Sequence, residues 1–196
     1  LRDKDVLEIG VGSGSHAGLL ARHAKSFTGI DLTDYAVEST SKRLKCFGLA
    51  GLVLQMDAEE MSFADNSFDF VWSWGVIHHS SDTRRILSEI ARVLRPGGRA
   101  VTMVYHRSAW NYYLIGGLIH GILRGGFFKT RSLHEIVQVH TDGAIARYYS
   151  TAEWRALVAE YFAVDDVLVF GSKLELLPLP SGRLKRLIGD MLSCRV

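Results

Sequence analysis

The stretch that decides the fold runs Val6-Leu7-Glu8-Ile9-Gly10-Val11-Gly12-Ser13-Gly14, close to the start of the chain. Its apolar residues predict a strand, and a helical pattern follows the last glycine. Glycine suits the turn between them because its backbone angles are unrestricted and because a missing Cβ lets a ligand lie against the main chain. The next helix then offers free N–H groups at its start. The segment predicts a ligand-binding loop, with a glycine turn that binds nothing as the alternative.

Working outward, short apolar runs alternate with helical patterns, which is typical of a parallel sheet built from βαβ units. One helix is predicted over Asp82–Leu94, stopped by Pro96-Gly97-Gly98, and another over Ser150–Phe162, where Ser150 and Glu153 have capping-box spacing. Seven strands are expected, at Val6–Ile9, Phe27–Ile30, Leu52–Gln55, Phe68–Ser73, Arg99–Tyr105, Val164–Phe170 and Met191–Val196.

Composition limits the class of protein. The 196 residues correspond to a single domain, and 47% hydrophobic with 22% charged residues is typical of a globular chain. The 23 Lys and Arg exceed the 21 Asp and Glu by only two and form no long basic run, so we expect no nucleic-acid partner. Two cysteines, Cys46 and Cys194, without a CxxC motif or a signal-peptide pattern, predict free thiols and a cytoplasmic protein.

Asp31 ends the second predicted strand, about twenty residues after the glycines. A carboxylate at this place can accept hydrogen bonds from both hydroxyls of a ribose, so the pair of features predicts an adenosine-containing cofactor. Gly12 to Ala17 also fits the GxGxxA pattern of dinucleotide enzymes, so NAD remains an alternative cofactor at this point. The alternative role of Asp31 is to cap a helix that starts at Thr33 or Asp34.

Four further segments follow in order, at residues 56–63, 66–71, 76–79 and 92–98. With them, the chain resembles the class I S-adenosylmethionine (SAM) dependent methyltransferases, in particular the small-molecule group that includes the ubiquinone/menaquinone methyltransferases. The resemblance runs from Val6 to about Tyr105. It implies a three-layer α/β, Rossmann-like fold with a seven-stranded, mostly parallel sheet in the order 3-2-1-4-5-7-6, whose last strand is antiparallel.

The resemblance also implies roles for individual residues. In that family the glycine loop holds the methionine moiety, and the end of the second strand holds the ribose. The segment after the third strand contacts the adenine, and the segment after the fourth strand lies near the reacting sulfur. Asp57 could instead be a turn residue, Trp74 a core residue and His79 part of a helix cap. The cofactor-binding residues implied are Glu8, Gly10, Gly12, Gly14, Asp31, Leu32, Asp57, Ala58, Trp74 and Gly75.

Methyl transfer from a sulfonium demands alignment and exclusion of water, with no metal ion and no covalent nucleophile. An acceptor that must lose a proton needs a base, and histidine suits neutral pH. His106, after the fifth strand, and His79 are the catalytic candidates, with His78 beside them and a structural role as the alternative for each. The chain lacks the [N/D/S]PP[Y/F/W] motif of amino methyltransferases that act on bases, since it has Ser73-Trp74-Gly75-Val76 there.

Residues 106–149 are too long for a simple crossover, and we expect a helical insertion that caps the site. Gly117, Gly121 and Gly125 would leave one helix face bare, either to pack on the domain's own core or to meet a flat ligand. Residues 111–128 could touch a membrane surface without spanning it. We expect one domain over residues 1–196, which lacks the helices that the family places before the first strand.

The leading hypothesis is therefore a SAM-dependent methyltransferase for a small, apolar or amphipathic acceptor. An NAD-dependent oxidoreductase would share the glycines and Asp31 but would leave Asp57 and the 92–98 segment without a role. A SAM-binding module without turnover would keep the cofactor residues and lack an acceptor site.

Overall fold

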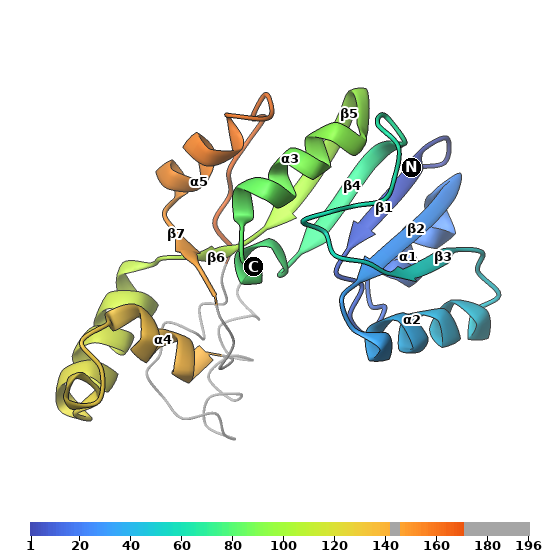
Figure 1. Ribbon diagram of the computed structural model, residues 1–196. Helices are drawn as coiled ribbons and strands as arrows, with labels where there is room; N and C mark the ends of the chain where they lie inside the picture. The colour runs from blue at the N-terminus through green and yellow to red at the C-terminus, as the bar shows by residue number, and fades with distance from the viewer. Residues whose placement is uncertain (142–145, 171–196) are drawn as a thin grey trace, which may run out of the picture. The chain divides into compact units, whose positions relative to one another are not determined.

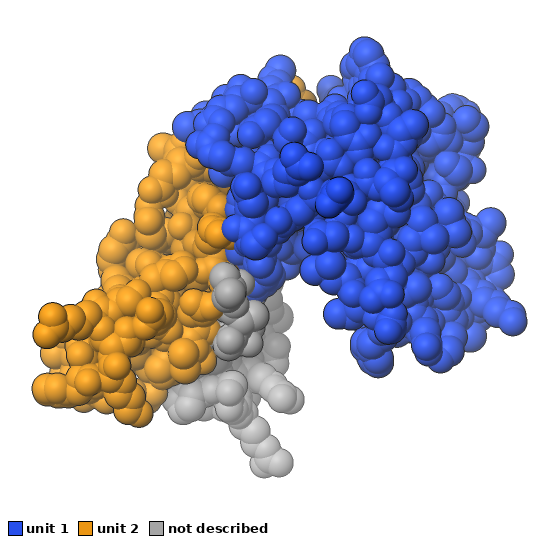
Figure 2. All heavy atoms as spheres, viewed as in Figure 1, with its two compact units in different colours: residues 1–105, 155–164 blue, residues 106–154, 165–196 orange. Residues whose placement is uncertain are grey.

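The computed structural model describes residues 1–141 and 146–170 (Figure 1). The chain divides into two compact units (Figure 2). The first comprises Leu1–Tyr105 and Arg155–Val164, and the second comprises His106–Trp154 and Asp165–Val196. The glycine loop and all the predicted cofactor residues belong to the first unit.

A five-stranded parallel sheet in the order β3-β2-β1-β4-β5 forms the centre of the first unit. Because all five strands are parallel, the loops after their carboxyl ends meet at one edge, where open α/β sheets bind ligands. The order of the first five predicted strands is confirmed, and each lies at its predicted place except that the fifth begins five residues earlier and ends two residues earlier. The strands are β1 (Asp5–Ile9), β2 (Ser26–Asp31), β3 (Leu52–Gln55), β4 (Phe68–Trp74) and β5 (Leu94–Met103).

Helices cover both faces of this sheet. The chain moves from β1 toward β3 through α1 (Ala17–His23) and α2 (Asp34–Cys46), and it moves the opposite way, from β4 to β5, through α3 (Thr83–Val93). Since such crossovers are right-handed, the two directions place α1 and α2 on one face and α3 on the other (Figure 1). On the first face, a buried cluster joins Val6, Ala17, Leu20, Phe27 and Leu44.

Helix α3 confirms the predicted segment closely. The Asp82 carboxylate accepts hydrogen bonds from the backbone N–H groups of Arg84 and Arg85, as expected of an N-cap. Strand β5, however, already begins at Leu94, so Pro96-Gly97-Gly98 lies inside it at an irregularity of the β4–β5 register. The buried face of α3 consists mainly of Ile86, Leu87, Ile90 and Val93.

Of the last two predicted strands, only the one over Val164–Phe170 lies within the described residues. The prediction over Val164–Phe170 is wrong, because these residues form no strand, and Leu168, Val169 and Phe170 are exposed rather than packed in a core. An apolar run becomes a strand only where a neighbouring strand takes up its backbone hydrogen bonds. Met191–Val196 lies outside the described residues.

The described part of the second unit is mainly helical, as expected of the insertion. It contains η2 (Ala109–Leu123), η3 (Gly126–Phe128) and α4 (Leu133–Thr141). A Cβ at Gly121 would lie 2.3 Å from the ring of Phe127, and one at Gly117 would lie 3.5 Å from Leu133, so side chains of the same unit cover these two glycines. Gly125 lies beyond the helix and has a φ of 71°. Glycine is favoured there because the turn requires a left-handed backbone conformation.

Two short strands, β6 (Tyr105–His106) and β7 (Tyr148–Tyr149), pair with each other, and α5 (Thr151–Val158) follows β7. The predicted capping box is present, since Glu153 N–H donates to the Ser150 hydroxyl and Ser150 N–H donates to the Glu153 carboxylate. The α-helix ends at Val158, four residues before the predicted end, and turns follow it. Over residues 1–141 and 146–170, no helix combines the length and the apolar character needed to cross a bilayer.

Candidate active site

The glycine loop is held against the end of β2. The N–H groups of Gly10 and Val11 both donate to the Ile30 carbonyl, at 2.8 and 3.2 Å. Gly10 has a φ of 77°, and a Cβ there would lie 2.1 Å from a methyl group of Val76. Gly12 has a φ of 52°, yet a Cβ there would meet nothing within 4 Å. Packing therefore requires glycine at position 10, while position 12 presents bare backbone to a ligand.

Helix α2 supports the loop from behind through a residue that the sequence analysis missed. Thr40 is fully buried, and its hydroxyl donates to the Gly12 carbonyl at 3.1 Å. Its signal was present in the sequence, because Thr40 stands four residues from both Ala36 and Leu44 on the buried stripe of α2. A polar residue on an apolar stripe needs a hydrogen-bond partner, and here the partner is the loop.

Asp31 joins the second strand to the glycine loop. One carboxylate oxygen accepts a hydrogen bond from Gly12 N–H at 3.1 Å, and the other accepts from the N–H and the hydroxyl of Thr33, at 3.0 and 2.9 Å. Thr33, not Asp31, caps α2. An ionised carboxylate has about four acceptor positions, so Asp31 can also accept from a ligand. The structure thus brings the two main sequence features together.

Glu8 is buried directly below the loop. It is 1% exposed, and its Oε2 has no hydrogen-bond partner among the described residues, while Oε1 lies 3.9 Å from Nδ1 of His16. Burial, helped by the negative charge of Asp31, raises the pKa of Glu8 to about 8. The side chain is therefore mainly protonated at neutral pH, and it is a buried acid with one oxygen left for a ligand or a solvent molecule.

Aromatic rings lie next to Glu8. Trp72 stands opposite Glu8 in the β1–β4 register, and its ring stacks on that of Trp74 with centroids 5.2 Å apart and planes 6° from parallel. The ring of His16 lies 5.4 Å from Trp72 and 5.9 Å from Trp74. Trp74 and Gly75, both predicted site residues, follow directly at the end of β4. Trp72 and His16 are neighbours of the site that the sequence analysis did not single out.

The residues predicted to contact adenine lie beyond the ends of β2 and β3. Leu32 is 64% exposed, and its carbonyl accepts a hydrogen bond from the Gln55 side-chain amide at 3.0 Å. The Asp57 carboxylate accepts from Glu59 N–H at 2.8 Å, which is the turn role considered as its alternative, and the side chain remains exposed. Ala58 is buried. The Asp57 carboxylate thus stabilises a turn and is also accessible to a ligand.

The catalytic candidates belong to different units. His79 ends the short helix η1 (Ile77–His79) of the first unit, with its ring centroid 4.1 Å from that of the buried His78 and 5.6 Å from that of Tyr105. His106 is exposed on β6 and belongs to the second unit. Geometry within the first unit therefore groups His79, His78 and Tyr105 and does not include His106.

Comparison with known proteins agrees with this geometry. Residues 7–102 match the family model described as a methyltransferase domain, a range that holds the glycine loop, Asp31 and Asp57. The phthiotriol/phenolphthiotriol dimycocerosates methyltransferase of Mycobacterium tuberculosis is 41% identical over 100 residues, which are 50% of this chain and 36% of that protein. Phosphatidylethanolamine N-methyltransferase of Cereibacter sphaeroides is 36% identical over 98 residues, 49% of this chain and 48% of that protein.

Solved structures give the same class. The YcgJ protein of Bacillus subtilis has a TM-score of 0.63 at 23% identity, covering 82% of this chain and 62% of that one, and it shows the fold. A SAM-dependent methyltransferase of Thermotoga maritima has a TM-score of 0.56 at 27% identity, covering 82% and 64%. The chain belongs to the class I SAM-dependent methyltransferases. It matches less than half the length of the two curated relatives.

Proposed function

We propose that the protein transfers a methyl group from SAM to a small, apolar or amphipathic acceptor. One observation carries the proposal, namely that the N–H of Gly12, whose position has open space beside it, donates to Asp31, and that the buried acid Glu8 lies within the electrostatic influence of the same carboxylate. At the carboxyl end of β1 and β2, this arrangement offers a carboxylate that can accept from a diol, an open main-chain surface and a buried carboxyl oxygen with no partner among the described residues, and all three fit the polar groups of SAM.

In this proposal the chain holds the cofactor in three parts. Asp31 would accept the ribose hydroxyls, while Leu32, Asp57 and Ala58 would contact the adenine. The methionine end would lie along the loop. SAM supplies an activated methyl group when bound, so the protein's own task is to orient the two reactants and to exclude water. The residues proposed for the methionine end are Glu8, Gly10, Gly12, Gly14, Trp74 and Gly75.

We propose His79 and His106 as candidate bases for an acceptor that loses a proton. His79 lies half-buried just past the end of β4, which supports a place near the reacting group. His106 is exposed, so it is accessible to an acceptor. We keep one methyltransferase domain over residues 1–196, with residues 106–149 as the segment that selects the acceptor. The small number of cysteines supports a cytoplasmic location within the same proposal.

An apolar or lipid-like acceptor has two lines of support. The two curated relatives are named for a dimycocerosate and for phosphatidylethanolamine. The insertion also exposes apolar side chains, which favours contact with an apolar molecule or a membrane surface. These side chains are Leu118, Ile122, Leu123, Phe127 and Phe128.

Calorimetric titration with S-adenosylhomocysteine tests the cofactor part. We expect binding by the wild-type chain, strong loss of binding in Asp31→Ala, and unchanged binding in Asp3→Ala, which removes an exposed carboxylate at the chain start. Absence of binding by a folded sample, or equal affinity of Asp31→Ala and wild type, contradicts the proposal. Binding of NAD in its place would favour the oxidoreductase. A product screen with a labelled methyl donor then separates an enzyme from a SAM-binding module, since only an enzyme labels an acceptor.

A further inference from the structure

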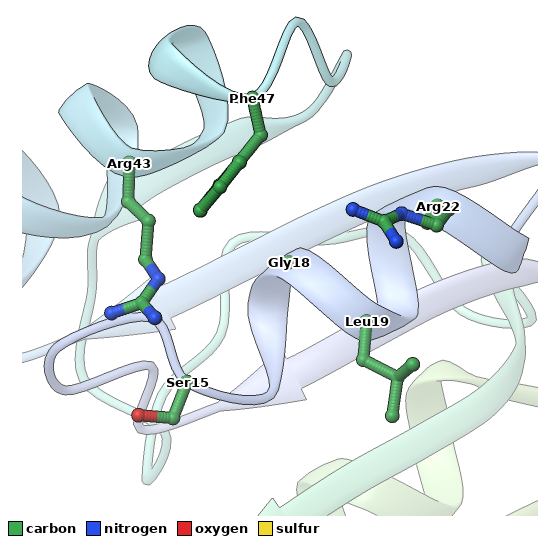
Figure 3. Close-up of a pocket in the computed structure, with 6 residues that line it drawn as sticks. All are labelled: Ser15, Gly18, Leu19, Arg22, Arg43 and Phe47. Carbon is green, nitrogen blue, oxygen red and sulfur yellow. The ribbon is translucent and has the colours of Figure 1, made fainter.

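A small pocket of about 180 Å³ opens between α1 and α2, next to the far end of the glycine loop. Figure 3 shows Arg22 on α1 and Arg43 on α2 on its two sides, with Ser15 near the glycine loop. Leu19 and Phe47 complete the lining with apolar surface, and they are 61% and 57% exposed. The pocket thus combines two cations, one hydroxyl group and an apolar rim.

The two arginines are electrostatically available. In the same unit, Arg84, Arg92 and Arg95 form ion pairs with carboxylates. In the part of the chain that the structure describes, neither Arg22 nor Arg43 has a carboxylate partner. The Arg43 guanidinium donates to the Ser13 carbonyl at 3.4 Å and lies over the Phe47 ring at 5.9 Å.

The floor of the pocket is open because it is formed by a glycine. Gly18 lies in α1, and a Cβ at this position would meet nothing within 4 Å. Glycine inside a helix lowers its stability, and no close approach of protein atoms requires one here. The missing side chain leaves space beside the two guanidinium groups.

We infer that the α1–α2 pocket binds the phosphate group of an amphiphile, with Arg22 and Arg43 on the phosphate oxygens and the apolar portion against Leu19 and Phe47. Guanidinium groups match phosphate oxygens in geometry and charge, and the Ser15 hydroxyl adds a donor. The exposed Leu19 and Phe47 favour a ligand with an apolar part over a bare anion. The inferred ligand is distinct from SAM, although Arg43 also contacts the glycine loop through the Ser13 carbonyl.

The test uses a soluble phosphate amphiphile, short-chain phosphatidylglycerol below its micelle concentration, titrated into the whole chain. We expect binding that weakens about fivefold in Arg22→Gln and in Arg43→Gln. Lys42→Gln is the matched control, because Lys42 is the neighbour of Arg43 in sequence but pairs with Glu38. Gly18→Ala places on the floor a Cβ that meets no protein atom within 4 Å and raises helix propensity, so it should fold and weaken ligand binding.

Further arms identify the apolar requirement and the source of the phosphate. Inorganic phosphate should bind more weakly than the amphiphile, and equal affinity would overturn the role of Leu19 and Phe47. Vesicles that contain phosphatidylglycerol, compared with pure phosphatidylcholine, show whether a bilayer supplies the group, and a soluble source is indicated if only the short-chain lipid binds. No binding of the short-chain lipid, or equal losses in Lys42→Gln and Arg43→Gln, would refute the site. Arg22→Gln should retain S-adenosylhomocysteine binding, which separates this test from that of the proposed function.

Discussion

Replacing Glu8 with glutamine should make the protein more stable at neutral and alkaline pH. Glu8 is 1% exposed and its pKa is raised to about 8, against an ordinary value of 4.5. Between these two values the unfolded chain ionises at this position while the folded chain keeps the proton, so wild-type stability falls as pH rises. The slope is about 1.4 kcal/mol per pH unit, which amounts to about 3 kcal/mol at pH 7 and about 5 kcal/mol above pH 8.

Urea denaturation from pH 4 to pH 9 measures the effect. The difference in free energy of unfolding between Glu8→Gln and wild type should be smallest at pH 4 and should grow by about 3 kcal/mol by pH 7. Glu60→Gln is the control, because Glu60 is exposed and the same change there should leave the pH dependence unaltered. Parallel pH profiles for wild type and Glu8→Gln would refute the argument. The variant should also bind S-adenosylhomocysteine more weakly, as expected of an acid kept for function at a cost in stability.

Three further substitutions have defined outcomes. Glu89→Gln removes the charge of a buried carboxylate that forms an ion pair with Arg92, so the free energy of unfolding should fall by about 3 kcal/mol. Urea denaturation measures this, and an unchanged midpoint would contradict it. Thr40→Val removes the hydrogen bond to the Gly12 carbonyl, so stability should fall by about 1 kcal/mol and calorimetry should show weaker S-adenosylhomocysteine binding; unaltered affinity would mean that the bond does not shape the loop. Asp82→Ala removes the N-cap of α3 and should cost about 1 kcal/mol in thermal unfolding, with affinity for S-adenosylhomocysteine retained.

The parts of the site predicted from sequence are those governed by local rules. A strand followed by glycines with positive φ and then a helix depends on residues that are neighbours in the chain, and the Asp82 cap depends on the next three residues. Asp31 lies next to the glycine loop because adjacent parallel strands end at the same edge of a sheet. Its hydrogen bond to Gly12 agrees with that rule.

The sequence by itself therefore determined the βαβ order, the glycine loop, the carboxylate at the end of the second strand and the class of protein. Tertiary structure decided what depends on distant neighbours. Burial raised the pKa of Glu8 and left one of its oxygens without a partner among the described residues. Helix α2 brought Thr40 and Arg43 to the loop, and α1 placed Arg22 across from Arg43. It also left Val164–Phe170 without a strand. The physical reason is that desolvation, hydrogen-bond partners and strand pairing are properties of the surroundings of a residue and not of its type.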